Sequence, residues 1–141
     1  MAENFARYTK DNPNTRIVIV GRNKAAAQSI ISSFPKPPTS SDTGPLHEFV
    51  SCDATLMKNI HLVSKDLLTR LPKINFLILS PAFLSTEGRN ETEEGIDKSL
   101  ALHYYARWKF IHDLMPLLRK AKGAGPQSVF ACTVEILIHL F

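Results

Sequence analysis

The stretch Ile17-Val18-Ile19-Val20, closed by Gly21, decides the fold class of this chain. Four apolar β-branched residues without polar alternation are typical of a strand covered on both faces, which is the habit of parallel sheets. Residues 48–52 and 76–79 are two further candidate strands, and helical patterns separate the three at spacings that fit strand–helix–strand crossovers. The sequence therefore predicts an α/β fold with a doubly wound sheet.

Apolar residues at spacings of three and four predict the helices between these strands. Residues 1–10 read as the end of a helix, and residues 25–34 as a short helix with one apolar face at Ala26, Ile30 and Phe34. Asp53 and Thr55 offer N-caps to the next helix. Its apolar positions are Leu56, Ile60, Val63, Leu67 and Leu71. A long helix is expected over roughly residues 92–121, and its apolar stripe is Leu100, Tyr104, Trp108, Ile111, Met115 and Leu118.

Composition limits the class of protein. The 141 residues suffice for one domain, and an apolar content of 44% can fill its core. The net charge of +4 is mild and its basic residues are scattered, which argues against a nucleic-acid surface. Cys52 and Cys132 lack metal-ligand spacing and read as reduced thiols. Without a signal peptide or a membrane-length apolar run, we expect one soluble, cytoplasmic domain over residues 1–141, with no metal site.

Ligands of doubly wound sheets bind at the carboxyl ends of the strands. In this chain those ends are Gly21-Arg22-Asn23, Cys52-Asp53-Ala54 and Ser80-Pro81-Ala82-Phe83. Arg22 can pair with a phosphate, since its neighbours offer no carboxylate that would repel one. Asp53 can accept hydrogen bonds from a ligand, cap the following helix, or do both.

The three strand ends resemble, in order and spacing, those of the short-chain dehydrogenase/reductase family. In that family an Arg after the second strand is typical of NADP-preferring members, and an Asp after the third strand meets the adenine amine; Arg22 and Asp53 stand at similar positions. Residues 79–83 are similar to the family's Asn-Asn-Ala-Gly turn, although only Ala82 matches. The resemblance implies a Rossmann-type sheet and hydride transfer between NADP(H) and a carbonyl or alcohol. It implies cofactor contacts from Arg22, Asn23, Asp53, Ala54, Ser80 and Ala82.

Two later segments are similar to the fourth helix of the family's retinol-dehydrogenase-like branch. Thr92-Glu93-Glu94-Gly95-Ile96-Asp97 resembles its start, and Met115-Pro116-Leu117-Leu118 resembles its end. Together they place His103 where the family usually carries an Asn, although a lone helix His is more often structural. Residues 128–133 would be the fifth strand, so the resemblance covers roughly residues 1–133.

Two segments of the family have no counterpart in the sequence. No GxxxGxG or GxGxxG motif occurs, so the resemblance implies a partial sheet that lacks the first strand and its pyrophosphate-binding turn. The strands and helices after the fifth strand, including the helix with the catalytic Tyr and Lys, are lacking as well. Tyr105-Ala106-Arg107-Trp108-Lys109 matches YxxxK by letters, but it lies one strand and one helix too early. We therefore assign no catalytic residue.

Three interpretations of function stay open. The first is an NADP-dependent oxidoreductase of this family, acting on a carbonyl or alcohol in its complete form and inactive as this chain, with cofactor binding weak or lost. The second is a non-catalytic truncated form that pairs with a full-length relative, and the third is an unrelated flavodoxin-like binding domain. Whether the chain itself is an enzyme stays undecided, and each interpretation is compatible with a homo- or hetero-oligomer.

The sequence also carries an expectation about folding. In the resembled family the first strand lies between the strands at residues 17–20 and 76–79, so without it these two would lose their shared partner or pair directly. The segment Val134-Glu135-Ile136-Leu137-Ile138-His139-Leu140-Phe141 is apolar and weakly charged, which makes it an aggregation hazard if nothing covers it. The expectation is a marginally stable chain.

Overall fold

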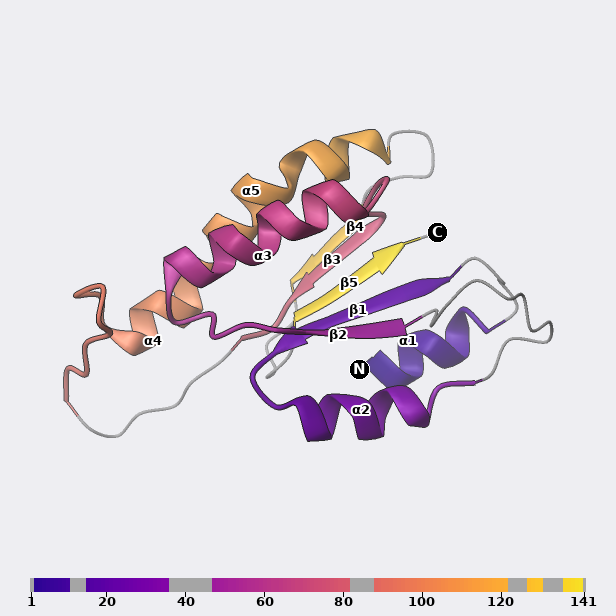
Figure 1. Cartoon of the computed structure of the whole chain (residues 1–141), viewed down its shortest axis with the longest axis horizontal. Coiled ribbons are helices and arrows are strands. Elements are labelled where there is room, and N and C mark those ends of the chain that lie inside the picture. Colours follow the sequence, from indigo (N-terminus) through magenta and orange to yellow (C-terminus); the bar gives the residue numbers. More distant parts are fainter. Residues whose placement is uncertain are drawn as a thin grey trace.

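The computed structural model describes residues 2–10, 15–35, 47–81 and 88–121, together with the strand backbone at 127–130 and 136–140. The strands are β1 (Arg16–Gly21), β2 (His47–Ser51), β3 (Phe76–Leu79), β4 (Gln127–Phe130) and β5 (Ile136–Leu140). They form one sheet in the order β2-β1-β5-β3-β4 (Figure 1).

Helices cover both faces of this sheet. On one face lie α1 (Ala2–Tyr8) and α2 (Lys24–Ser32), and on the other lie α3 (Met57–Arg70) and α5 (Ala106–Lys120) (Figure 1). The short helix α4 (Lys98–Leu100) runs through a π-helical turn, η1 (Ala101–Tyr105), into α5. The predicted α/β fold with helices on both faces is confirmed. None of the described helices is long and apolar enough to cross a membrane.

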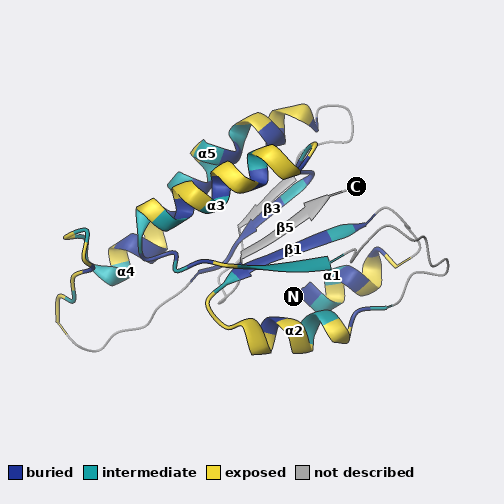
Figure 2. Cartoon of the chain, in the orientation of Figure 1, coloured by how far each residue is buried: buried dark blue, intermediate teal, exposed yellow. Residues whose placement is uncertain are grey.

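Strand β1 is buried on both faces, as its unbroken apolar run predicts (Figure 2). Val18 and Val20 pack into the larger core with Leu77 and Leu79 of β3 and with α3 and α5. Ile17 and Ile19 belong to the smaller core, which α1 and α2 complete. Because successive side chains of a strand point to opposite faces, this one run serves both cores.

Strand β5 occupies the centre of the sheet and corrects the folding expectation. It pairs antiparallel with β1 on one side and with β3 on the other, while β1–β2 and β3–β4 are parallel pairs. Thus β1 and β3 neither lose a shared partner nor pair directly. The backbone of residues 136–140 is paired with a strand on each side, whereas the side chains of this apolar segment lie outside the described residues.

The long helix buries the predicted stripe only in part: Leu118 is buried and Ile111 packs against the core, but the first half of the stripe is exposed. Its buried residues are Ala101, Leu102, Ala106, Phe110, Leu114, Leu117 and Leu118. Leu100, Tyr104 and Trp108 of the predicted stripe are instead exposed, at 48%, 53% and 59%. The helix therefore carries two apolar stripes, and periodicity alone does not say which one meets the sheet. In α2, similarly, Ala27 rather than Ala26 is buried.

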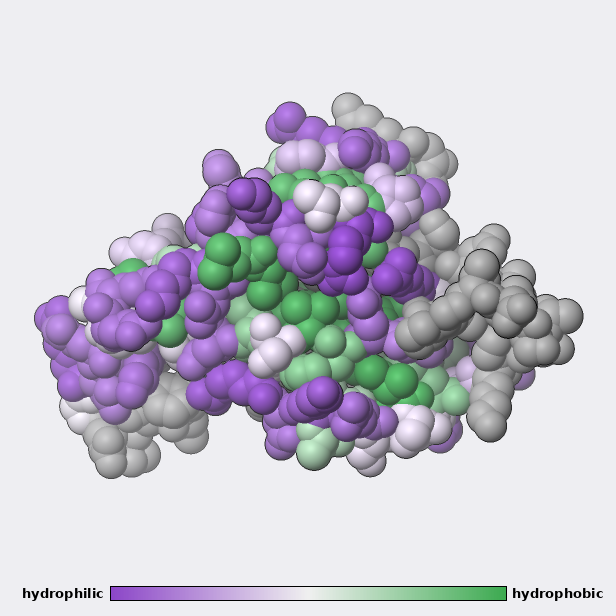
Figure 3. All heavy atoms as spheres, viewed as in Figure 1, coloured by the Kyte–Doolittle hydropathy of each residue, from purple (hydrophilic) through white to green (hydrophobic). Residues whose placement is uncertain are grey.

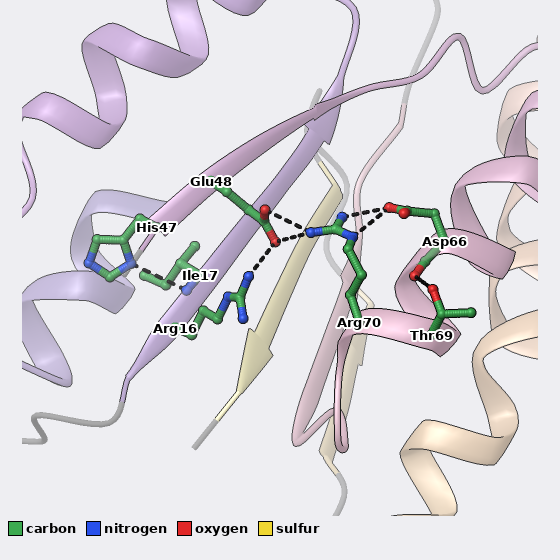
Figure 4. A network of polar contacts seen from close by, with 7 residues as sticks. All are labelled: Arg16, Ile17, His47, Glu48, Asp66, Thr69 and Arg70. Carbon is green, nitrogen blue, oxygen red and sulfur yellow. Dashed lines mark hydrogen bonds and ion pairs between the residues drawn. The ribbon is translucent and has the colours of Figure 1, made fainter. Parts of the chain in front are cut away.

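Charged side chains surround the start of β2, the edge strand of the sheet, at the end opposite to the strand carboxyl ends. Glu48 of β2 accepts hydrogen bonds from Arg16 of β1 at 3.0 Å and from Arg70 of α3 at 2.9 Å (Figure 4). Arg70 also pairs with Asp66 one helical turn earlier. Hydrophobic atoms gather around β2 and the adjacent side of α3 (Figure 3), and these ion pairs at their border disfavour edge-to-edge association.

Candidate functional site

A pocket of about 290 Å³ opens at the carboxyl edge of the sheet. Its walls come from the ends of β1 and β2, from Pro81 after β3, from α2 and from the π-helical turn. The lining residues at the strand ends are Gly21, Arg22, Asn23, Cys52, Asp53, Ala54 and Pro81. The remaining walls are Ile19, Val20, Ala26, Ala27, Phe49 and Leu102. Four of the six predicted cofactor-binding residues thus line one cavity.

Arg22 and Asn23 follow β1 directly. Asn23 is the N-cap of α2, and its side-chain oxygen accepts a hydrogen bond from the Ala26 N–H at 3.0 Å. The Arg22 side chain is exposed, and it forms no ion pair with any residue that the structure describes. A guanidinium at the rim without a partner carboxylate is available to an anion.

Asp53 does not cap α3, contrary to one of the two roles considered for it. Its Oδ1 accepts hydrogen bonds from the Thr55 N–H at 2.9 Å and from the Thr55 hydroxyl at 2.7 Å, which closes the turn before the helix. Its Oδ2 accepts none from the described residues. Ala54 is buried beside it. Asp53 therefore keeps one carboxylate oxygen for a donor in the pocket.

Cys52 lines the pocket as a buried free thiol. Burial, helped by the charge of Asp53, raises the pKa of the Cys52 thiol to about 11. The side chain is therefore protonated at neutral pH and serves as an apolar wall rather than as a nucleophile. The second cysteine, Cys132, lies outside the described residues.

The end of β3 contributes less than predicted. Ser80 is buried at 2% exposure but does not line the pocket, whereas its neighbour Pro81 does. The Pro81 carbonyl accepts a hydrogen bond from Arg107 Nη2 at 3.4 Å, which ties this end of the sheet to α5. Ala82, the last predicted contact, lies outside the described residues.

A carboxylate from a distant segment caps the helix beside the pocket. The N-cap residue of α3, Leu56, has no side-chain hydrogen bond of its own. Instead, Glu94 accepts the Met57 N–H at 2.7 Å and the Lys58 N–H at 3.0 Å. Gly95, with φ of +74°, supplies the left-handed turn that presents Glu94, a conformation that glycine adopts without strain.

Sequence reasoning missed the apolar walls of the pocket. Leu102 was not singled out, because the stripe assigned to its helix ran along the other face. Phe49, in the second predicted strand, was not given a ligand-facing role. The only available signal was their place in buried elements, which does not say that a side chain faces a cavity.

Lys109, the last residue of the YxxxK pattern, takes part in an ion pair within α5. Lys109 Nζ pairs with Asp113 Oδ2 at 2.5 Å, one turn along α5, and Tyr105 is 42% exposed. Burial opposes ionisation of Asp113, but hydrogen bonds from His112 and Lys109 outweigh it and leave the pKa of Asp113 below its usual 3.8. Tyr105 and Lys109 do not line the pocket. His103 is exposed and does not line it either.

The described residues contain no cluster of three His, Cys, Asp or Glu side chains that could hold a metal ion.

Sequence relatives of the chain are oxidoreductases. The chain is 36% identical to Oxidoreductase AN1596 of Emericella nidulans, over 96% of this chain and 38% of that protein. It is 30% identical to the Short-chain dehydrogenase/reductase SAT2 of Stachybotrys chartarum, over 96% of this chain and 39% of that protein. The chain thus spans less than two fifths of the length of these curated relatives. No protein-family model matches it.

The fold of the chain is similar to part of a solved short-chain dehydrogenase structure. A short-chain dehydrogenase from Sphingobium yanoikuyae in complex with NADPH superposes with a TM-score of 0.63, over 92% of this chain and 47% of that one. At 19% identity this likeness concerns the fold alone. The chain is thus similar in sequence to parts of oxidoreductases, one of them named a short-chain dehydrogenase/reductase, and similar in fold to part of a short-chain dehydrogenase.

Proposed function

We propose that the chain is part of an NAD(P)-dependent oxidoreductase of the short-chain dehydrogenase/reductase type, and that its pocket receives the adenosine end of NADP(H). The observation that carries this proposal is the single cavity lined by Arg22, Asn23, Asp53 and Ala54. A guanidinium at the rim favours a phosphate, and the free oxygen of Asp53 favours an amine or hydroxyl donor. In the complete protein the reaction would be hydride transfer to a carbonyl or from an alcohol.

The finer assignments are parts of the same proposal. We place the chain in the retinol-dehydrogenase-like branch, as a truncated form located in the cytoplasm, with a preference for NADP over NAD. The described residues present neither a glycine-rich turn nor a Tyr–Lys pair at the pocket, so we expect weak cofactor binding and no turnover from this chain alone. Association with a second copy or a full-length relative fits the proposal.

The proposal is tested by calorimetric titration of the 141-residue chain with NADPH and NADH. We expect NADPH to bind with a dissociation constant above the micromolar range, and more tightly than NADH. Arg22→Ala should weaken NADPH by about tenfold, the effect of one charge-assisted hydrogen bond at an exposed site, and leave NADH almost unchanged.

Arg119→Ala, at the far end of α5, is the matched control and should change neither affinity. Submicromolar affinity for NADPH would contradict the weak-binding part of the proposal. Absence of binding by either dinucleotide at millimolar concentration would contradict the cofactor assignment itself.

A further inference from the structure

Strand β5 takes its backbone partners from segments far from it in the sequence. It pairs with residues 16–20 of β1 on one side and with residues 76–79 of β3 on the other (Figure 1). Strand β4, which precedes β5 in the chain, pairs with β3 and not with β5 among the described strands. The strand is therefore held by the slot between β1 and β3, and the same strand of a second copy fits that slot equally well.

The connection from β4 to β5 has to pass from one side of β3 to the other. Phe130 at the end of β4 and Ile136 at the start of β5 are both paired with Leu79 of β3. Because neighbouring strands lie about 5 Å apart, the two ends of the connection are about 10 Å apart across the end of β3. Only residues 131–135 are available for this passage.

The end of β3 is also the place where that strand's own chain leaves the sheet. Ser80 is 2% exposed, and Pro81 is buried beside it. Arg107 of α5 donates a hydrogen bond to the Pro81 carbonyl at 3.4 Å, which holds the departing chain against the helix. Known folds avoid connections that cross one another on the same edge of a sheet. The passage from β4 to β5 over this point is therefore an unfavourable feature of the fold within one chain.

Exchange of β5 between two copies removes that passage. The chain then runs from β4 into the neighbouring copy, where β5 fills the slot in the same register and direction. When both copies do this, each slot is filled and the pair closes on itself, as two-fold symmetric dimers do. A short connection before an exchangeable element favours this form of assembly.

We propose that the chain forms a reciprocal strand-exchanged dimer, in which residues 136–140 of each copy pair with β1 and β3 of the other copy. The partner is a second copy of this chain, and backbone hydrogen bonds at the centre of the sheet recognise it. The inference goes beyond the proposed function and does not depend on the cofactor assignment.

Directed cross-linking tests the exchange. Arg16 and Leu140 face each other across the β1–β5 pair. Opposed residues of antiparallel strands have Cα atoms about 4.5–5.5 Å apart, within the range of a disulfide. Arg16→Cys and Leu140→Cys are made in separate chains whose own cysteines are removed by Cys52→Ala and Cys132→Ser. The two chains are unfolded, refolded together and mildly oxidised.

We expect a covalent dimer from the mixture and none from either variant alone. A chain that carries both new cysteines should likewise give a dimer joined by two cross-links. Lys58→Cys with Glu93→Cys, at an ion pair within one copy, is the matched control and should cross-link within one chain. A cross-link within one chain for the pair at 16 and 140, with no covalent product from the mixture, would overturn the proposal.

Sedimentation of the unmodified chain is a second measurement, and it needs no substitution. We expect a dimer that dissociates no faster than the chain unfolds, because β5 must leave the centre of the sheet to be released. Insertion of Gly-Ser-Gly-Ser after Thr133 should weaken dimerisation by about tenfold, because a longer connection eases the passage over β3 within one chain. The same insertion after Gly123, between α5 and β4, should not.

A monomer at every concentration up to about 1 mM, where even weak specific association is seen, would overturn the proposal. A dimer that dissociates faster than the chain unfolds would overturn it as well, because surface contacts and not an exchanged strand would then join the copies.

Discussion

At the scale of single residues, Glu94 shows how one side chain joins a loop to a helix. It is 37 positions from Met57 in sequence, yet its carboxylate takes the N-cap role that Leu56 cannot fill. The neighbouring Glu93 instead forms an exposed ion pair with Lys58. Because a helix cap is worth more than an exposed ion pair, the two adjacent glutamates are expected to differ in their contribution to stability.

Glu94→Ala is expected to lower the free energy of unfolding by about 1 kcal/mol, within the usual range for loss of an N-cap. Glu93→Ala, the matched control, should change it by less than about 0.5 kcal/mol. Urea denaturation followed by circular dichroism measures both. Equal effects of the two substitutions would show that Glu94 is not the cap of α3.

His47 gives the stability a dependence on pH. Its Nδ1 accepts the Ile17 N–H at 3.2 Å, which requires that nitrogen to be unprotonated, and burial lowers the pKa of His47 below its usual 6.5. With the folded-state pKa depressed, the unfolded chain binds the proton first as the pH falls. The contribution of His47 is therefore complete above pH 6.5 and is lost progressively below it.

We expect the wild-type chain to lose about 1 kcal/mol more stability than His47→Gln between pH 7 and pH 5, roughly the worth of one hydrogen bond. Comparison with the variant isolates the part of the pH dependence that comes from His47. Denaturant melts at several pH values decide the matter, and parallel pH profiles of the two proteins would contradict the role of His47.

At the scale of elements, the decisive piece is β5. Residue Ile138 faces Val18 of β1 on one side and Leu77 of β3 on the other, so its backbone lies at the middle of the sheet. Central strands do not tolerate proline, because it removes an N–H donor and its ring disturbs the pairing. A proline at Ile138 is therefore expected to destabilise the fold.

Ile138→Pro should destabilise the fold by about 3 kcal/mol or more, in the range that marks disruption of a core element. Ile138→Val keeps the N–H and the β-branched side chain, and should cost no more than about 1.5 kcal/mol. Chemical denaturation compares the two. If both variants unfold at the same urea concentration as the wild type, β5 is not the central strand.

At the scale of the whole molecule, stability depends on five residues near the carboxyl-terminal end of the chain. Among the described strands, β1 and β3 each pair with β5 and not with each other. A buried central strand contributes on the order of 10 kcal/mol, and the entire stability of an ordinary domain is about 5–15 kcal/mol. Loss of β5 is therefore expected to remove cooperative folding as a whole.

The chain without residues 134–141 should show no sharp thermal transition, should bind a hydrophobic dye and should aggregate as its concentration rises. Thermal scans with circular dichroism at several concentrations measure this. A synthetic peptide of residues 134–141 is the control, since its addition should restore part of the transition. A sharp, concentration-independent melt of the shortened chain would contradict the role of β5.

The sequence by itself determined the local elements and the class of the fold. The run at residues 17–20 predicts a doubly covered strand, the run at 76–79 matches β3, and the periodic residues Ile60, Leu67 and Leu71 are buried as predicted. The strand ends at Arg22 and Asp53 were placed correctly at one edge of the sheet. These features follow from patterns within a few residues, which local sequence determines through side-chain periodicity.

Only the tertiary structure decided the choices that depend on distant partners. The face of α5 that meets the sheet was undetermined, because the helix carries two apolar stripes and packing selects Leu102, Ala106 and Phe110. The cap of α3 comes from Glu94, which no local pattern links to that helix. The reversed direction of β5 was equally invisible, because an apolar strand has the same alternation in either direction. Only five residues separate β4 from β5, too few for the crossover that a parallel strand would need, so β5 runs antiparallel to its neighbours.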